Sequence, residues 1–441
     1  METDEDAVLS FNVETNFVGN DLDDMEGVFS MDNVVFRQGD KEVGVNSLSL
    51  SAVSEGNGRK ELSFFSDYLN GTIIGRYFFA SLPARLHNLA HHYMPAVVKE
   101  TKDVIQPDDR GNDFKFDFTI ENLEAIHEVY PMPLVVVDEA RLTGYYRDSD
   151  ELFRVRLEAP QLRKGESTLA DVLLLFENPN DKLKLLARTT YHSRNRVRHP
   201  YYLSLNTMTE RNDVNLDFSF SNSQEETYSG RVSLSSLFHD YSKGNGIVAD
   251  FRFKPSKIIL NDTTWNIRES NISVRYKDIE VDSFLFDNES QFLSIDGKNS
   301  QAPSDSIKVK FSDLFLGYIS NIIANESVTF DGVVDGDLYL FQLLENPHFK
   351  GDLYVYDGTL NDYVLGDMAV KTTWLENKKC VDFGVDILSP YGDRQDLSKS
   401  TLRGGVFLAD DSLYIHGDLH DAGPAELTSL ESAVRYARER T

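Results

Sequence analysis

Three histidines in the stretch HNLAHH are candidate metal ligands. His87 and His91 stand four residues apart, and His92 follows directly. Two imidazoles one helical turn apart can hold a metal ion together. The sequence has no HExxH glutamate beside them and offers no obvious third ligand. We therefore interpret these histidines as part of a solvated helix face and predict no metal site.

Adjacent carboxylates are the second candidate for chemistry, because paired acids can act as general acid and base. Asp108–Asp109 and Asp410–Asp411 are such pairs, but adjacent pairs arise by chance among 72 acidic residues. DGDLYL and DRGNDF fall short of the calcium-binding loop pattern, and no GxSxG, Walker or GxGxxG motif occurs. We predict a protein that is not an enzyme and carries no cofactor.

The charge balance limits the possible partners. The 72 acidic residues exceed the 44 basic ones, which gives a net charge of −28. Such a chain repels phosphate backbones and anionic lipid headgroups, so we expect no nucleic acid and no electrostatic docking on a membrane. Cys380 is the single cysteine, so no intrachain disulfide can form. No run approaches the roughly 18 apolar residues of a spanning helix, and METDEDAVLSF lacks the layout of a signal peptide.

Apolar and polar residues alternate along most of the 441 residues, which places apolar side chains on one face of each strand. Ile272, Val274 and Tyr276 show the pattern. Further runs with the same alternation start at Leu9, Leu48, Phe114, Phe153, Val172, Val214, Ile307 and Val381. Turn signals such as QGDK, NPND and KGNG separate the runs. Strands joined by short turns pair antiparallel, so the sequence predicts an all-β fold.

Four segments have the composition or spacing of short helices, namely residues 81–100, 121–130, 312–325 and 425–440. Ser81 is a candidate N-cap for the first, and Pro95 ends or kinks it. The amphipathic segments 81–100 and 312–325 could plug or gate a groove or touch a membrane. We favour the simpler interpretation, in which they cover an edge or end of the sheet.

The large number of expected strands raises the question of where their apolar faces go. Roughly 25 strands without a linker predict one elongated segment over residues 1–441, which at about 4.8 Å per strand would extend roughly 120 Å. A twisted sheet this wide must close, pair with a second sheet or curl into a trough. Arg154, Arg156 and Glu158 at outer positions argue against a transmembrane barrel. A dry sandwich core and an open trough both fit the alternation.

Ile259–Phe286 carries a resemblance to a known family. Asn261, Asp262, Trp265 and Ile267 match a "hydrophobic-x-N-D-x-x-W-x-I" phrase, and the later matches are Asp282, Phe284, Leu293, Ile295 and Gly297. Residues 314–367 resemble a helix, a glycine-punctuated strand pair and a "G-D-L" strand, followed by Trp374 and Lys378–Lys379. Residues 66–95 resemble an earlier strand and amphipathic helix. In this order, these patterns resemble the TamB-like proteins of Gram-negative envelopes.

The resemblance implies an elongated antiparallel sheet curled into a groove, related to the AsmA-like and bridge-type lipid-transfer proteins. Members are anchored in the inner membrane and reach across the periplasm. They are implicated in moving phospholipid toward the outer membrane and, with an outer-membrane barrel partner, in assembling outer-membrane proteins. This sequence lacks the anchor helix and a convincing partner-binding domain, so we expect a middle segment of a longer periplasmic chain.

A continuous apolar trough would let acyl chains slide while headgroups stay in water, since each buried CH₂ stabilises the bound lipid by ~0.8 kcal/mol. The expected lining consists of Phe114, Phe116, Phe118, Val155, Leu157, Leu216, Phe218, Phe220, Val274, Tyr276, Val309 and Phe311. For each of them, dry sheet-on-sheet packing is the alternative. A structural or glycan-binding surface protein is the alternative for the whole chain, and a polysaccharide lyase lacks support because no fixed-length repeat occurs.

Overall fold

The structure of the chain is a computed structural model. It describes residues 7–19, 23–100, 111–192, 201–222, 228–241, 246–318, 330–344, 347–360, 363–375, 378, 380–387, 400–407 and 412–418. The chain divides into two compact units, Met1–Glu225 and Glu226–Thr441. That the two units together form one elongated segment over residues 1–441 stays a prediction.

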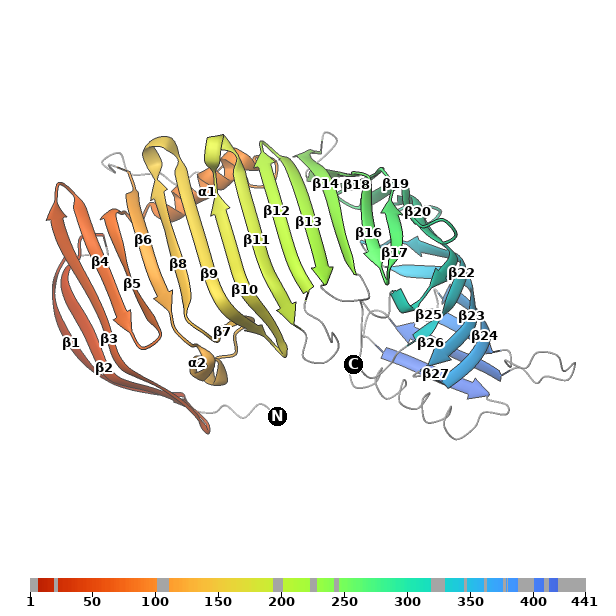
Figure 1. Cartoon of the computed structure of the whole chain (residues 1–441), viewed down its shortest axis with the longest axis horizontal. Helices are drawn as coiled ribbons and strands as arrows, with labels where there is room; N and C mark the ends of the chain where they lie inside the picture. The colour runs from red at the N-terminus through yellow and green to blue at the C-terminus, as the bar shows by residue number, and fades with distance from the viewer. Residues whose placement is uncertain are drawn as a thin grey trace, which may run out of the picture. The chain divides into compact units, whose positions relative to one another are not determined.

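The first unit is built from antiparallel strands in chain order (Figure 1). Its strands are β1 (Ala7–Val18), β2 (Glu26–Gln38), β3 (Lys41–Gly56), β4 (Arg59–Ser66), β5 (Leu69–Arg76), β6 (Asp113–Ile120), β7 (Val135–Val136), β8 (Ala140–Arg147), β9 (Leu152–Lys164), β10 (Ser167–Glu177), β11 (Leu183–His192), β12 (Tyr201–Glu210) and β13 (Asp213–Asn222). Each pairs with the next, except that β6 pairs with β8 and the short β7 pairs with β9.

Two α-helices and two 3₁₀ turns interrupt these strands. They are α1 (Leu82–Tyr93), α2 (Glu124–Val129), η1 (Asp148–Asp150) and η2 (Pro179–Asp181). The helices expected within 81–100 and 121–130 are thereby confirmed, with α1 ending before Pro95 as its fixed ring requires. No helix among the described residues is both long and apolar enough to pass through a bilayer.

The second unit is also antiparallel. Its strands are β14 (Ser229–Asp240), β15 (Ile247–Phe253), β16 (Ser256–Leu260), β17 (Thr263–Ile267), β18 (Ser270–Arg275), β19 (Asp278–Asp287), β20 (Phe292–Asn299), β21 (Ile307–Phe315), β22 (Phe330–Phe341), β23 (His348–Leu360), β24 (Tyr363–Leu375), β25 (Cys380–Ile387), β26 (Ser400–Phe407) and β27 (Ser412–Asp418). The predicted all-β antiparallel fold is therefore confirmed.

Two long strands of the second unit are each broken once. β15 and β16 both pair with β14, and the break between them falls at Lys254–Pro255, where proline has no N–H to donate. β17 and β18 both pair with β19 and are broken at Arg268–Glu269. From β19 to β27 each strand pairs with the next.

A repeated bulge bends this unit. Ser283 in β19, Asp313 in β21 and Asp357 in β23 each have a positive φ at a shift of register. The backbone N–H of each donates to a carboxylate on the following strand, at 3.2 Å to Asp296, 2.9 Å to Asp335 and 3.1 Å to Asp367. A bulge bends its strand and increases the local twist, so the same device repeats on alternate strands.

The helix expected over 312–325 is wrong at its start. Ser312–Phe315 continue strand β21, because the bulge at Asp313 lets the strand bend and still bury Leu314 at 2% exposure. Residues 319–325 of that helix, and all of the helix expected over 425–440, lie outside the described residues.

Candidate functional site

The inner face of the first unit is the face on which α1 packs. Strand register aligns one row of side chains across it, from Phe64 through Phe118, Leu157 and Leu205 to Phe218. Between these lie Gly71, Leu142, Leu174 and Ala187, and beyond Phe64 the row continues to Leu50 and Phe29. Every side chain in this row is half-buried, and none is charged.

A second row runs beside the first. It consists of Leu62, Ile73, Phe116, Gly144, Val155, Phe176, Leu185, Thr207 and Leu216. Phe176 is 37% exposed and the others are half-buried. The two rows, which we call the inner rows, form an apolar surface that is two side chains wide on the strands they share and many strands long.

Two glycines in the inner rows leave space that neighbouring phenylalanine rings fill. A Cβ on Gly144 would lie 2.4 Å from Cζ of Phe116, and a Cβ on Gly71 would lie 2.4 Å from Cδ1 of Phe118. Each phenyl ring therefore lies across the neighbouring strand in the space that a side chain would take. Neighbouring rings follow one another at 6.5 Å (Phe114–Phe116) and 6.3 Å (Phe116–Phe118) between centroids.

Helix α1 closes one end of this face. Leu89 and Tyr93 of the helix pack with Phe114, Tyr146 and Phe153 in one buried cluster. Burial raises the pKa of the Tyr146 phenol and raises that of Tyr77, in the same cluster, to about 12. In Figure 1 the helix lies behind the strands, so the viewer sees the opposite face of the sheet.

Polar contacts hold α1 in place. Nε of Arg85 lies 3.0 Å from Oδ2 of Asp148, and both side chains are largely buried. Asn178 donates from Nδ2 to the hydroxyl of Tyr93 at 2.9 Å and accepts from the N–H of Phe153 at 2.8 Å. Paired in this way, the buried polar groups cost little and fix the position of the helix.

The other end of the face is covered near α2 and β7. Ala140, Ala159 and Leu162 are buried there, and Ile120, Val136 and Leu169 pack around them. The inner rows thus run between two covered ends. In the second row, Leu62, Ile73, Phe116 and Val155 pack against the α1 cluster. In the first row only Leu157 packs against either cluster, the one near α2, and the other described members belong to neither.

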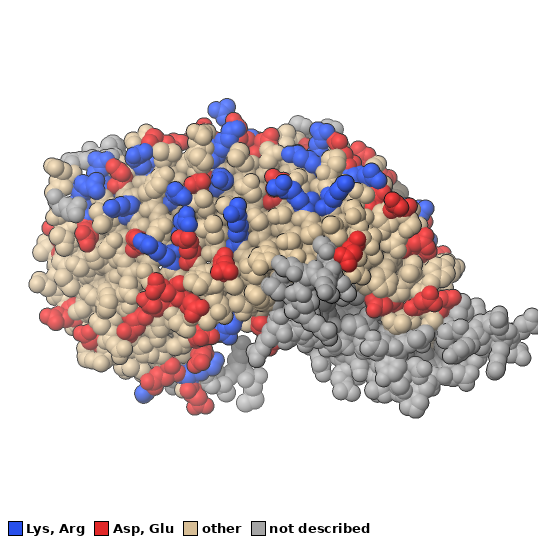
Figure 2. Space-filling model, in the orientation of Figure 1, with Lys and Arg blue, Asp and Glu red and all other residues tan. Residues whose placement is uncertain are grey.

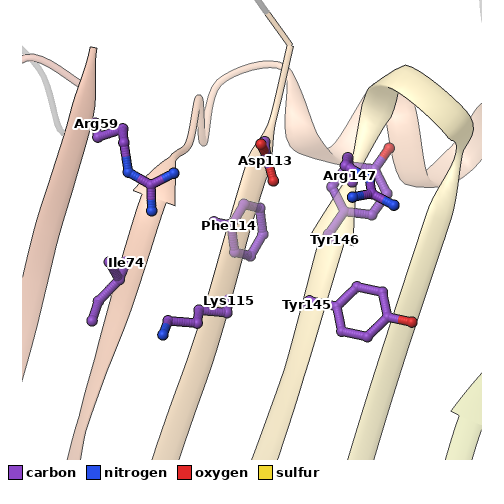
Figure 3. Close-up of a pocket in the computed structure, with 8 residues that line it drawn as sticks. All are labelled: Arg59, Ile74, Asp113, Phe114, Lys115, Tyr145, Tyr146 and Arg147. Carbon is purple, nitrogen blue, oxygen red and sulfur yellow. The ribbon is translucent and has the colours of Figure 1, made fainter. Parts of the chain in front are cut away.

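The outer face of the same strands carries the charge. Figure 2 shows basic and acidic side chains interspersed over it. Arg156 pairs with Glu158 at 2.6 Å, and Arg141 pairs with Asp117 at 2.6 Å, where the Arg141 hydrogen bond lowers the pKa of the Asp117 carboxyl. A shallow depression here is lined by Ile74, Lys115 and Tyr145, with Arg59, Asp113 and Arg147 around it (Figure 3). Because Arg147 is ion-paired with Asp150 at 2.6 Å and Asp113 adds a carboxylate to the lining, we do not interpret this depression as an anion site.

The side chains on the Trp265 face of the second unit form a buried hydrophobic core. Leu260, Trp265, Leu314, Val355 and Ile387 are among the members of one buried cluster that draws on strands from β16 to β25. Trp265 is 0% exposed, stacks on Phe286 at 4.7 Å and meets the ring of Tyr318, beyond β21, edge-on at 5.5 Å. Apolar residues of distant strands therefore cover each other.

The twelve residues expected to line a trough separate into three groups. Phe114, Phe116, Phe118, Val155, Leu157, Leu216, Phe218 and Phe220 share the inner face of the first unit, with Phe114 buried under α1. Val309 is buried, Phe311 packs against the core of the second unit, and Val274 is half-buried in β18. Tyr276 was wrongly placed on a strand: it lies in the β18–β19 turn at φ 47 and is 66% exposed.

Sequence reasoning missed several members of the inner rows. Phe64, Leu142 and Leu205 belong to them although none was expected to line a trough. The signal was present in part, since each stands in a short alternating run. Gly71 and Gly144 hide it, because they occupy face positions with no side chain.

The three histidines of the HNLAHH motif contact other groups in the structure. His87 and His91 lie on α1, and their ring nitrogens stand 2.6 Å from the carbonyl oxygens of Lys99 and Val98. His92 pairs with Asp181 at 2.9 Å. Within the described part of the chain, no three His, Cys, Asp or Glu side chains are grouped so that they could bind a metal ion.

Comparisons of the chain with family models, with curated proteins and with solved structures find no match.

Proposed function

We propose that the inner rows of the first unit bind lipid acyl chains and that the protein works as a lipid-transfer protein. The observation that carries the proposal is the length of the uncharged first row, whose side chains are all half-buried from Phe29 to Phe218 and, apart from Leu157, belong to neither described cluster at the covered ends. Large apolar surfaces left uncovered in this way usually mark a binding surface. Eleven strands at about 4.8 Å spacing give the first row a length of roughly 48 Å.

Acyl chains suit this surface better than other apolar ligands do. The surface is long, narrow and without hydrogen-bonding groups apart from the Thr207 hydroxyl in the second row. Each CH₂ group laid on it is worth up to ~0.8 kcal/mol, and no single residue has to recognise the chain. A rigid ligand with polar groups would need fixed donors and acceptors, which specific small-molecule sites supply.

The wider role follows the resemblance to TamB-like proteins. We propose a periplasmic protein that conducts phospholipid between the inner and outer membranes and supports outer-membrane biogenesis, with an outer-membrane barrel protein as partner. What supports this role is the order of the motifs from residue 66 to Lys379, together with a β-rich chain that offers an apolar face. We propose no enzymatic step for this chain.

The test uses two neighbouring phenylalanines on opposite faces of β4. Phe64 belongs to the inner rows, whereas Phe65 points to the outer face and is 59% exposed. Purified wild-type protein, Phe64→Asp and Phe65→Asp are incubated with phospholipid vesicles, re-isolated and extracted for mass spectrometry. We expect phospholipid on the wild type and on Phe65→Asp, and several-fold less on Phe64→Asp.

Two results would contradict the proposal. One is a wild-type protein that is folded by circular dichroism but carries no phospholipid. The other is equal lipid on both variants, because lipid held at the inner rows must be sensitive to a carboxylate placed among them.

A further inference from the structure

A row of hydrogen-bonding side chains crosses the outer face of the first unit. From β3 to β9 it consists of Ser51, Ser63, Thr72, Asp117, Thr143 and Arg156, which strand register places side by side. Each member directly precedes or follows an inner-row residue in the sequence, so its side chain points to the opposite face. All six are half-buried, and we call them the outer polar row.

The charged members of the outer polar row are paired with neighbours. Asp117 pairs with Arg141 at 2.6 Å. Arg156 pairs with Glu158, also at 2.6 Å. Because these charges cancel in pairs, the row offers hydrogen-bond donors and acceptors without a net charge of its own. Lys115, beside the row, adds one exposed cation. Side chains of this kind suit a ligand that is rich in hydroxyl groups and carries no charge.

A depression of about 540 Å³ lies over the middle of the row. Thr72, Asp117, Thr143 and Arg156 line it together with Tyr145, which also lines the depression drawn in Figure 3. No described residue hydrogen-bonds to the hydroxyl of Thr72 or of Thr143. A threonine hydroxyl can both donate and accept hydrogen bonds, so these two groups are available to a ligand in the depression.

Two exposed aromatic rings flank the row on opposite sides. Phe65 is 59% exposed and aligns with Asn70 on β5. Tyr145 is 41% exposed and aligns, across β6, with Ile74 on β5. Thr72 lies between these two positions on β5, so the rings stand on either side of the row. An exposed aromatic ring beside polar groups provides an apolar face on which the C–H groups of a sugar ring can pack.

We propose that the outer polar row binds a neutral, linear, β-1,4-linked glycan laid across the strands. Six strands at about 4.8 Å spacing span about 24 Å and place one hydrogen-bonding side chain near each sugar ring of such a chain. The sugar hydroxyls bond to the row, and the C–H faces of the rings pack on Phe65 and Tyr145.

The shape and charge of the row select the kind of glycan. A straight row fits the extended chain that β-1,4 linkages give, whereas α-1,4-linked glucans coil. The net charge of −28 repels acidic glycans. Because the outer polar row and the inner rows lie on opposite faces of the same strands, the glycan site is separate from the proposed lipid site.

The experiment titrates the whole protein with three neutral hexasaccharides by isothermal titration calorimetry. Cellohexaose and chitohexaose are β-1,4-linked, and maltohexaose is α-1,4-linked. Phe65→Ser removes one flanking ring, and Thr143→Val removes a hydroxyl of the row at nearly constant volume. Tyr202→Ser is the control, because it removes an aromatic ring that is 50% exposed on β12, outside the row.

We expect a β-1,4-linked hexasaccharide to bind several-fold more tightly than maltohexaose, with an affinity that does not change between low and high salt. Phe65→Ser and Thr143→Val should each weaken this binding several-fold, and Tyr202→Ser should leave it unchanged. The phospholipid content of Phe65→Ser should equal that of the wild type, since Phe65 is not in the inner rows.

Four outcomes would overturn the proposal. These are no binding of either β-1,4-linked glycan, equal or tighter binding of maltohexaose, and a loss of affinity in Tyr202→Ser as large as that in Phe65→Ser. The fourth is an affinity that falls steeply with salt, because it would assign binding to charged groups instead of the hydroxyls and rings of this surface.

Discussion

The two units turn the same sequence pattern into different faces. In the first unit, Phe118, Leu157 and Phe218 stay half-buried in a long row. In the second, Trp265 and Leu314 are buried at 0% and 2% exposure in a shared core. Alternation along a strand decides only which side chains share a face. The bend of the strands decides whether that face meets another.

The bulges account for much of this difference. The second unit repeats a bulge on β19, β21 and β23, each fastened by a carboxylate of the next strand. Apart from glycines, the described strands of the first unit have positive-φ residues at Asn33 and Asp171, and no such carboxylate contact is described for either. Bends repeated on alternate strands curl a sheet until its apolar side chains meet, whereas a sheet with fewer bends stays open.

The largest expected effect comes from truncating the core of the second unit. Trp265→Ala should lower the free energy of unfolding by about 3–5 kcal/mol, because a fully buried aromatic ring is removed. Phe118→Ala in the inner rows should cost about half of that, since its ring is already partly in solvent. Urea unfolding followed by circular dichroism measures both. Equal costs would show that the two faces are packed alike.

A smaller loss of stability is expected when a Cβ is added at Gly144, where the ring of Phe116 lies over the glycine. Gly144→Ala should destabilise the protein by about 1–3 kcal/mol, because the added Cβ meets Phe116 at 2.4 Å and the carbonyl oxygen of Arg154 at 2.2 Å. Gly44→Ala is the control, as the nearest atom to its Cβ lies 3.9 Å away. A neutral Gly144→Ala, measured by thermal unfolding, would mean that Phe116 does not lie over this glycine.

The smallest effect concerns pH at the end covered by α1. Burial raises the pKa of Tyr77 from 10.0 to about 12, so the folded state favours the neutral phenol. The resulting stabilisation is complete below pH 10 and is lost as the pH rises from about 10 to 12. Between pH 9 and 11.5 the free energy of unfolding of the wild type should therefore fall by about 1–2 kcal/mol more than that of Tyr77→Phe. Urea midpoints at the two pH values measure it, and an unchanged pH dependence would contradict the burial of this phenol.

The sequence allowed us to predict the strands and which apolar side chains share a face of the sheet. It did not allow us to predict whether that face is covered by other side chains. The alternation of Phe114, Phe116 and Phe118 is local geometry, and register confirmed it across eleven neighbouring strands of the first unit. The prediction that Tyr276 lies on a strand was wrong because the apolar alternation continues through a turn that contains no glycine or proline. The helix predicted to start at residue 312 was wrong because residues 312–315 continue strand β21, which bends at a bulge at Asp313. Open and closed faces need the same residues, so composition cannot separate them.

Lipid binding at the inner rows is tested by mapping where an acyl chain contacts the protein. The protein is loaded with a phospholipid that carries a photoreactive diazirine in its acyl chain, irradiated and digested for mass spectrometry. We expect labels on inner-row positions such as Phe118, Leu157 and Phe218, and none on Trp265 or Leu314. Labels in the core around Trp265, or none on the inner rows of a lipid-loaded protein, would contradict it.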